Sequence, residues 1–113
     1  MKQQNRTCPA RIVETIMRSA QDILRFLAQN KAELDRRFGV RRIGLYGSYA
    51  SGTQRADSDV DLVVELKEPR FDDLAGLHIY LEQALGCKVD VRRLSKKIHT
   101  PFIQRIEEEA LYV

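Results

Sequence analysis

The stretch GSYASGTQRADSDVDLVVEL, residues 47–66, places Asp57, Asp59 and Asp61 at every second position, directly before the most hydrophobic run in the chain. Acids with this spacing occur in a calcium-binding loop, in a solvated turn, or along one face of a β-strand. A calcium loop is disfavoured because its sixth position needs a glycine for a sharp turn, and Leu62 stands there. Leu62 and the two valines after it favour an extended, buried environment. We therefore interpret this stretch as a turn that leads into a strand.

On a strand, side chains alternate between the two faces, so Asp59 and Asp61 share one face and the aliphatic residues take the other. Two carboxylates that point the same way repel each other, and a divalent cation removes that repulsion. The stretch KVDVRRL, residues 88–94, alternates in the same manner and places Asp90 on its polar face. A helix with its connections fits between Asp61 and Asp90, which allows the two strands to be neighbours. The spacing therefore predicts that three carboxylates converge and bind one or two Mg²⁺ ions.

Upstream of the acids, Gly47 and Ser48 stand where a predicted strand, residues 41–47, turns into a short helix. Backbone N–H groups at such a turn favour an anion, and a glycine allows a phosphate to approach closely. A Gly-Ser pair alone usually marks only a turn, and an Asp-x-Asp pair alone usually marks a solvated strand end. The combination, with a third acid on a following strand, indicates metal-assisted nucleotidyl transfer.

The rest of the chain predicts a small α/β (α+β) fold with a mixed sheet flanked by helices. Its 113 residues, 43% hydrophobic and 31% charged, suit one globular domain over 1–113. We expect an N-terminal helical segment over 1–38 and a catalytic core over 41–113. Apolar spacing and capping residues predict helices over about 9–29, 31–38, 71–85 and 101–110, and strands over 41–47, 60–66 and 88–94.

Composition also restricts the cellular setting that we expect. No apolar run reaches the roughly 20 residues of a membrane span, and the first residues lack the apolar core of a signal peptide. Cys8 and Cys87 are too few for a disulfide framework, so we expect a cytoplasmic protein with no membrane partner. Residues 1–42 hold ten Lys or Arg against four Asp or Glu, whereas residues 43–113 hold nine against twelve. A solvated helix face accounts for the basic part, so direct nucleic-acid binding is not expected.

The motif Gly-Ser, spacer, Asp-x-Asp resembles the signature of the DNA polymerase beta-like nucleotidyltransferase superfamily. The chain is most similar to the minimal nucleotidyltransferases, the MNT antitoxin-type proteins, over nearly its whole length. The resemblance implies that Gly47 and Ser48 bind a nucleoside triphosphate. It also implies that Asp59, Asp61 and Asp90 are catalytic and hold Mg²⁺.

One part of the motif departs from that family. Relatives often carry arginines within the Gly-Ser segment, where this chain has Tyr49 and Ser51. These arginines would balance the triphosphate charge. Arg55, in the spacer before the acids, is a candidate replacement, although an arginine in such a spacer is by default a surface residue.

The resemblance further implies a function with ATP as substrate, two Mg²⁺ ions and a protein partner. The chain would transfer AMP to a tyrosine hydroxyl of a HEPN-type RNase toxin and so act as the antitoxin of a toxin–antitoxin pair. The alternative is a non-catalytic binding module that neutralises the toxin by contact. A third possibility is a ribonuclease, because Arg93 and His99 have the Arg-x5-His spacing of HEPN toxins. That pair follows a predicted strand and precedes Pro101, so we interpret it as a basic connector.

Overall fold

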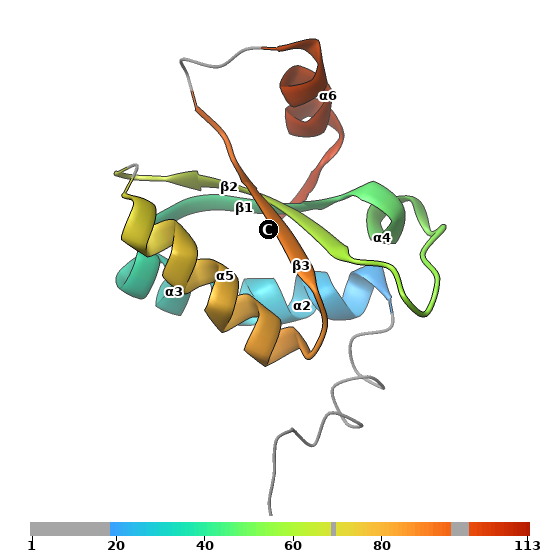
Figure 1. Ribbon diagram of the computed structural model, residues 1–113, viewed down its shortest axis with the longest axis horizontal. Helices are drawn as coiled ribbons and strands as arrows, with labels where there is room; N and C mark the ends of the chain where they lie inside the picture. The colour runs from blue at the N-terminus through green and yellow to red at the C-terminus, as the bar shows by residue number, and fades with distance from the viewer. Residues whose placement is uncertain (1–18, 69, 96–99) are drawn as a thin grey trace, which may run out of the picture.

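The computed structural model describes residues 19–68, 70–95 and 100–113 (Figure 1). Its elements in chain order are α2 (Ala20–Gln29), α3 (Lys31–Phe38), β1 (Val40–Tyr46), α4 (Gly47–Ser51), β2 (Val60–Leu66), α5 (Phe71–Leu85), β3 (Val89–Arg93), α6 (Pro101–Glu109) and β4 (Leu111–Tyr112). The mixed sheet flanked by helices confirms the predicted fold class. None of the helices in these ranges is long and apolar enough to cross a membrane.

The four strands form one sheet in the order β3-β2-β1-β4. β1 runs antiparallel to β2 and β4, whereas β2 and β3 are parallel. Parallel neighbours need a crossover, and α5 supplies it between β2 and β3. The end of β1 therefore meets the starts of β2 and β3, and this sheet end also carries the turn into α4.

Helices α2, α3 and α5 cover one face of the sheet, as Figure 1 shows. The aliphatic half of β2 faces these helices: Val60, Leu62 and Val64 are fully buried, as the strand alternation predicted. Helix side chains such as Ile23 and Leu77 complete this main core and are also fully buried.

Among the residues that the structure describes, α6 is the helix that covers the opposite face of the sheet (Figure 1). A small second cluster, built from Val63, Leu94 and Ile106, attaches this helix to the sheet. Asp61 stands two residues before Val63 on β2 and therefore lies on this less covered face. The main core and the acids thus occupy opposite sides of the sheet.

Several helix ends follow the predicted signals. Thr100 begins α6: its hydroxyl oxygen accepts a hydrogen bond from the backbone N–H of Ile103 at 3.1 Å, and Pro101 occupies the first turn. The first predicted helix, over about 9–29, ends at Gln29 as expected but is not continuous through Ser19. Ser19 has an extended backbone, and its hydroxyl oxygen accepts a 3.2 Å hydrogen bond from the backbone N–H of Asp22, so α2 begins only at Ala20. The part of the prediction before residue 19 lies outside the described residues. The short strand β4 was not predicted. Its two residues are too few to show a strand period.

Candidate active site

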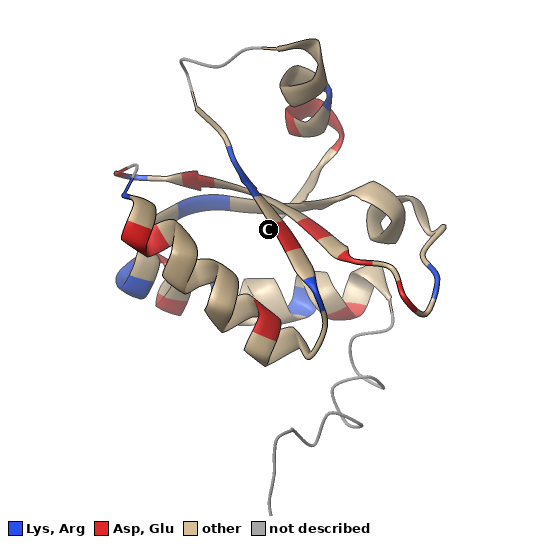
Figure 2. Cartoon of the chain, viewed as in Figure 1, with Lys and Arg blue, Asp and Glu red and all other residues tan. Residues whose placement is uncertain are grey.

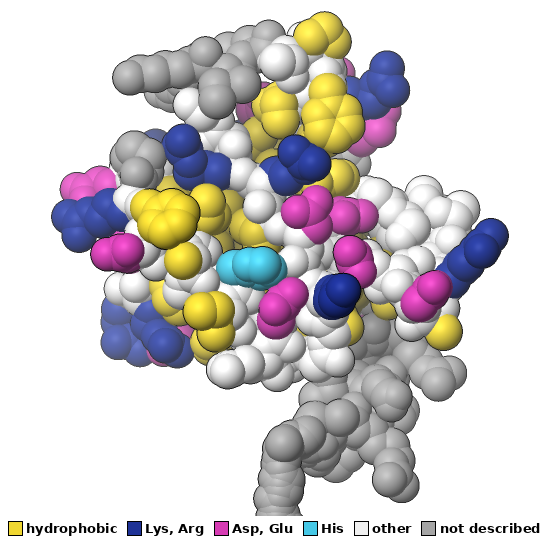
Figure 3. Space-filling view, viewed as in Figure 1, with side chains coloured by type: hydrophobic (Ala, Val, Ile, Leu, Met, Phe, Trp, Pro, Cys, Tyr) yellow, Lys and Arg dark blue, Asp and Glu magenta, His cyan; other side chains and the backbone are white. Residues whose placement is uncertain are grey.

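A row of three polar side chains crosses the sheet at the end of β1. Tyr46 on β1 pairs with Asp61 on β2, and Asp61 pairs in turn with Asp90 on β3. Residues directly opposite each other on neighbouring strands point to the same face, so all three side chains lie on the face that α6 partly covers. Figure 2 shows acidic positions next to each other on β2 and β3, and in Figure 3 acidic side chains gather on the surface over these strands. The structure thus places Asp61 and Asp90 side by side, as the strand pattern predicted.

Asp61 has a raised pKa because it is partly buried and lies near two other acids. Burial is the largest cause, followed by the negative charges of Asp90 and then Asp59, while Arg92 acts in the opposite direction. Asp59 is exposed and immediately precedes β2. The other two predicted carboxylates therefore act electrostatically on Asp61, which is partly buried as Asp90 is.

Arg92, which sequence reasoning did not single out, lies beside this row on β3. Its Nε is 3.6 Å from Oδ2 of Asp90, and its guanidinium lies 5.3 Å from the ring centre of Phe102 on α6. Burial and then the charge of Asp90 raise the pKa of the Tyr46 hydroxyl, and Arg92 opposes both. Arg92 and Tyr46 thus frame the acids on the side that faces α6.

Gly47 brings the turn after β1 directly against Asp61. Its φ angle of 76° is in the left-handed region, and a Cβ atom added there would overlap Oδ2 of Asp61 and lie 2.9 Å from its Cγ. Ser48 follows as the second residue of α4 and is partly buried. The predicted nucleotide-binding pair and the predicted metal ligand Asp61 therefore meet in one place.

The structure also locates the positions at which relatives often have arginine. Tyr49 is buried in the main core, with 8% of its surface exposed, so its side chain does not reach the solvent beside the acids. Ser51 is exposed at the end of α4. Arg55 lies on the exposed loop before β2, where its backbone N–H donates a 2.7 Å hydrogen bond to Oγ of Ser58. None of these three residues puts a cation against the acid row.

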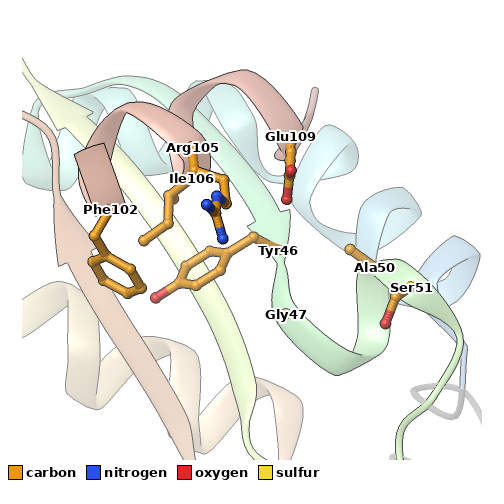
Figure 4. A pocket seen from close by; sticks show the side chains of 8 residues that line it. All are labelled: Tyr46, Gly47, Ala50, Ser51, Phe102, Arg105, Ile106 and Glu109. Atoms are coloured by element: carbon orange, nitrogen blue, oxygen red, sulfur yellow. The ribbon is translucent and has the colours of Figure 1, made fainter.

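A cavity of about 310 Å³ opens between α4 and α6, next to Gly47 (Figure 4). Its lining consists of Tyr46, Gly47, Ala50, Ser51, Phe102, Arg105, Ile106 and Glu109. Arg105 and Phe102 were missed as site residues. The sequence predicts the helix α6, but it contains no signal that this helix packs next to the turn at Gly47. The predicted connector that ends at His99 lies partly outside the described residues.

The residues present fit a magnesium site that is completed by substrate. Within residues 19–68, 70–95 and 100–113, no three His, Cys, Asp or Glu side chains are gathered closely enough to hold a metal ion by themselves. Mg²⁺ usually binds one or two carboxylates and takes its remaining ligands from water and substrate phosphates. The pair formed by Asp61 and Asp90, with Asp59 nearby, supplies that donor set. The pKa of Asp61 is raised first by burial and then by the charges of these two neighbours, which a bound cation would offset.

The sequence matches known nucleotidyltransferases. The model of the nucleotidyltransferase domain family matches residues 27–113. MJ1379 of Methanocaldococcus jannaschii, assigned as a protein adenylyltransferase, is 40% identical over 101 residues, which cover 86% of this chain and 100% of the relative. The protein adenylyltransferase MntA of Thermococcus cleftensis is 37% identical over 98 residues, which cover 86% of this chain and 98% of the relative.

Solved structures agree with these matches. A structure assigned as a minimal nucleotidyltransferase superposes with a TM-score of 0.64 at 35% identity, over 80% of this chain and 92% of the other. A toxin–antitoxin structure with AMP-PNP superposes with a TM-score of 0.60 at 26% identity, over 74% of this chain and 69% of the other. The chain therefore belongs to the nucleotidyltransferase domain family, within its minimal nucleotidyltransferases, as the sequence motif predicted.

Proposed function

We propose that this nucleotidyltransferase transfers AMP from ATP to a tyrosine hydroxyl of a HEPN-type RNase toxin, and that it acts as the antitoxin of that toxin. The observation that carries the proposal is the contact between the Gly47 turn and Asp61, with Asp90 next to it on the adjoining strand. This arrangement supports the proposal because the turn proposed to bind phosphate lies directly against the carboxylate pair proposed to hold the metal. A cytoplasmic location is part of the proposal, because ATP and RNA are both found there.

Each of the site residues predicted from the sequence has a role in this proposed reaction. The backbone at Gly47 and the hydroxyl of Ser48 would bind the β- and γ-phosphates. Asp59, Asp61 and Asp90 would hold Mg²⁺, as two ions in the proposed arrangement. When bound, the metal neutralises phosphate charge and lowers the pKa of the acceptor hydroxyl.

In the transfer, a bond forms between the acceptor oxygen and the α-phosphorus, and the bond between this phosphorus and the bridging oxygen to the β-phosphate breaks. Pyrophosphate leaves, and the acceptor oxygen gives up its proton. Asp90 is the proposed group that assists this deprotonation. Its side chain is only partly buried, and it lies on β3, the edge strand of the sheet, where an acceptor can approach.

The known relatives support the nucleotide and the partner. The Thermococcus cleftensis relative is a protein adenylyltransferase, and the toxin–antitoxin structure contains AMP-PNP, an ATP analogue. A tyrosine hydroxyl has an ordinary pKa near 10, which is within reach of metal activation. An adenylate on that tyrosine would add bulk and negative charge where an RNase must hold RNA phosphates. These points favour a toxin tyrosine as acceptor.

The second candidate function is a binding module that neutralises its toxin by contact alone. The observation in its favour is that neither Tyr49 nor Ser51 supplies the arginine that relatives often carry in this segment. The close packing of Asp61 against Gly47 opposes it, since a site that has lost its chemistry has no reason to keep carboxylates crowded together.

The test is to incubate the HEPN-type toxin with this protein, Mg²⁺ and ATP, and to measure the intact mass of the toxin. We expect the mass to rise by one or more AMP units, at a tyrosine, and to stay unchanged with Asp59→Asn. Neutralisation of the toxin by the wild type and by Asp59→Asn alike, with no change in the toxin's mass in either case, would reject the transferase proposal and support the binding module.

A further inference from the structure

We propose that Arg105 on α6 is the cation that neutralises the triphosphate of the bound nucleotide. This inference rests on the proposed function, which places the β- and γ-phosphates at Gly47 and Ser48. Arg105 lies 57 positions after Ser48 in the chain, and the fold brings its side chain to the same cavity as Gly47.

The cavity connects α6 to the turn after β1. Gly47, Ala50 and Ser51 form its α4 side, and Arg105 enters it from α6 with its guanidinium directed toward Tyr46 (Figure 4). Because Gly47 lines this cavity, a triphosphate bound at Gly47 would lie beside it. Arg105 is therefore placed to contact phosphate oxygens, for which the planar guanidinium is well suited because it can donate two parallel hydrogen bonds.

The charge of the ligand makes a cation necessary at this place. ATP carries about four negative charges and the three carboxylates proposed to hold the metal add about three, whereas the two proposed Mg²⁺ ions balance only about four of these seven. Helix α4 itself, Gly47–Ser51, contains no Lys or Arg. Arg92 already lies against Asp90 and over the ring of Phe102. Within the ranges that the structure describes, Arg105 has no ion-pair partner, so its charge is available to a ligand.

The position of Arg105 is fixed by the packing of its helix. The next residue, Ile106, is 5% exposed and packs with Val63 and Leu94 on the sheet. The hydroxyl of Tyr112, just after α6, donates a 2.9 Å hydrogen bond to the carbonyl oxygen of Glu107. These contacts hold the middle of α6 against the sheet, and they place the backbone of Arg105 beside the cavity that its exposed side chain lines.

Glu109 lies in the same cavity and provides a control of opposite sign. Its carboxylate is one helical turn from Arg105 and also lines the cavity. A phosphate chain in this place is attracted by Arg105 and repelled by Glu109. Removal of the two charges by substitutions of similar size should therefore change ATP affinity in opposite directions.

The experiment measures the affinities of Mg²⁺ with ATP and of Mg²⁺ with AMP by calorimetry for the wild type and four variants. We expect Arg105→Gln to weaken ATP binding about ten- to a hundredfold, the range of one charge-assisted contact, and to change AMP binding by less than about threefold. Arg105→Lys should recover part of the ATP affinity, since it restores the charge but not the paired donors. Glu109→Gln should make ATP binding tighter. Arg25→Gln, an exposed arginine on the opposite side of the sheet, should have no effect.

Two results would overturn the inference while the proposed function stands. The first is that the wild type transfers AMP and that Arg105→Gln binds ATP as tightly as the wild type does. The other is an equal loss of ATP and AMP binding in Arg105→Gln with an unchanged melting temperature, which would place Arg105 near the nucleoside instead of the triphosphate. A wild type that binds no ATP in the presence of Mg²⁺ would reject the proposed function and this inference with it.

Discussion

Asp61 is partly buried beside two other carboxylates, and this position costs the folded protein stability. Its pKa is raised by burial first and by the charges of Asp90 and Asp59 next. A raised pKa means that the folded state binds the proton more tightly than the unfolded chain does. The ionised carboxylate therefore destabilises the protein as pH rises above its ordinary unfolded value of about 4, and the loss is complete above the raised folded value.

We expect Asp61→Asn to raise the melting temperature of the nucleotide-free protein at pH 7 and to abolish metal-dependent ATP binding. The amide keeps the shape of the side chain and removes the repelled charge. The gain in melting temperature should disappear below about pH 4, where Asp61 is protonated in both states. Asp57→Asn, in the exposed loop before β2, is the control and should change the free energy of unfolding by less than about 0.5 kcal/mol. A lower melting temperature for Asp61→Asn at pH 7 would show that the carboxylate stabilises the fold.

Gly47 and Gly52 form a matched pair for testing the contact between the turn and the acid. Both have positive φ angles, 76° and 78°, so alanine is strained at either position by about 1–2 kcal/mol. A Cβ at Gly52 would meet no atom within 4 Å, whereas a Cβ at Gly47 would collide with Asp61. We expect Gly52→Ala to lower the free energy of unfolding by that strain alone and to keep ATP binding. Gly47→Ala should cost more stability in urea denaturation and should lose ATP binding. Equal effects in both variants would contradict the assigned contact.

At the residue scale, the acids could be predicted from the sequence and the arginine could not. Alternation along a strand is a local rule, so the order of residues within β2 and β3 is enough to place Asp61 and Asp90 on one face. Arg105 belongs to the site only because α6 folds back over the end of β1. That approach depends on tertiary packing, for which a single helix sequence contains no signal.

Among the described helices, α6 packs on the small second cluster and not on the main core. The buried cluster beneath it contains Val63, Leu94 and Ile106, whereas the main core on the other face draws on three helices. Helices with few buried contacts open more readily than the rest of a protein. Because α6 carries Arg105 and Phe102, the side of the site that it forms should also be the more mobile side.

We expect Ile106→Ala to loosen α6 without unfolding the rest of the domain. Removal of a buried isoleucine costs about 2–5 kcal/mol, and the small cluster favours the lower end of this range. Hydrogen exchange should become faster over residues 101–109 and stay unchanged in α2 and α5. The comparison is Ile23→Ala in the main core, which should accelerate exchange throughout the protein because Ile23 is fully buried there. Uniform acceleration in Ile106→Ala would show that α6 is part of the cooperative core.

Element boundaries were predicted well where the chain carries capping residues or a clear period. β2 lies at 60–66 as expected, and α6 begins at Pro101 after the Thr100 cap. β4 escaped prediction because a two-residue strand exists only through its pairing with β1, where Tyr112 lies opposite Gly44. A Cβ added at Gly44 would lie 2.8 Å from the ring of Tyr112, which is too close. The pairing of β4 with β1 therefore requires a residue without a side chain at position 44. Such a contact is a property of two segments and not of either alone.

At the scale of the whole molecule, the two faces of the sheet differ: one packs on the main core, and the other carries the candidate site. Its aliphatic face is closed by α2, α3 and α5, and its polar face is left partly open beside α6 (Figure 1). A ligand at the polar face adds contacts without disturbing the main core. Binding there should therefore appear as added stability of the entire domain.

We expect ATP to raise the melting temperature only when Mg²⁺ or Mn²⁺ is present. A ligand at about a hundred times its Kd adds about 2.7 kcal/mol to the free energy of unfolding. In the variant with both Asp59→Asn and Asp61→Asn this shift should vanish, since the metal loses its main ligands. Thermal melts with ATP, with and without EDTA, measure the effect. An equal shift in the double variant would reject the metal assignment to these aspartates.

The parallel pairing of β2 with β3 also sets the order in which the site can be assembled. Asp61 and Asp90 are 29 positions apart, and they become neighbours only after α5 has carried the chain back along the sheet. Closing a loop of this size has an entropic cost that local turns do not have, so such contacts form late in folding. During synthesis the carboxylates stay apart until Asp90 has left the ribosome, and Arg105 arrives later still. A growing chain therefore brings Asp61, Asp90 and Arg105 together only when translation of this domain is almost finished.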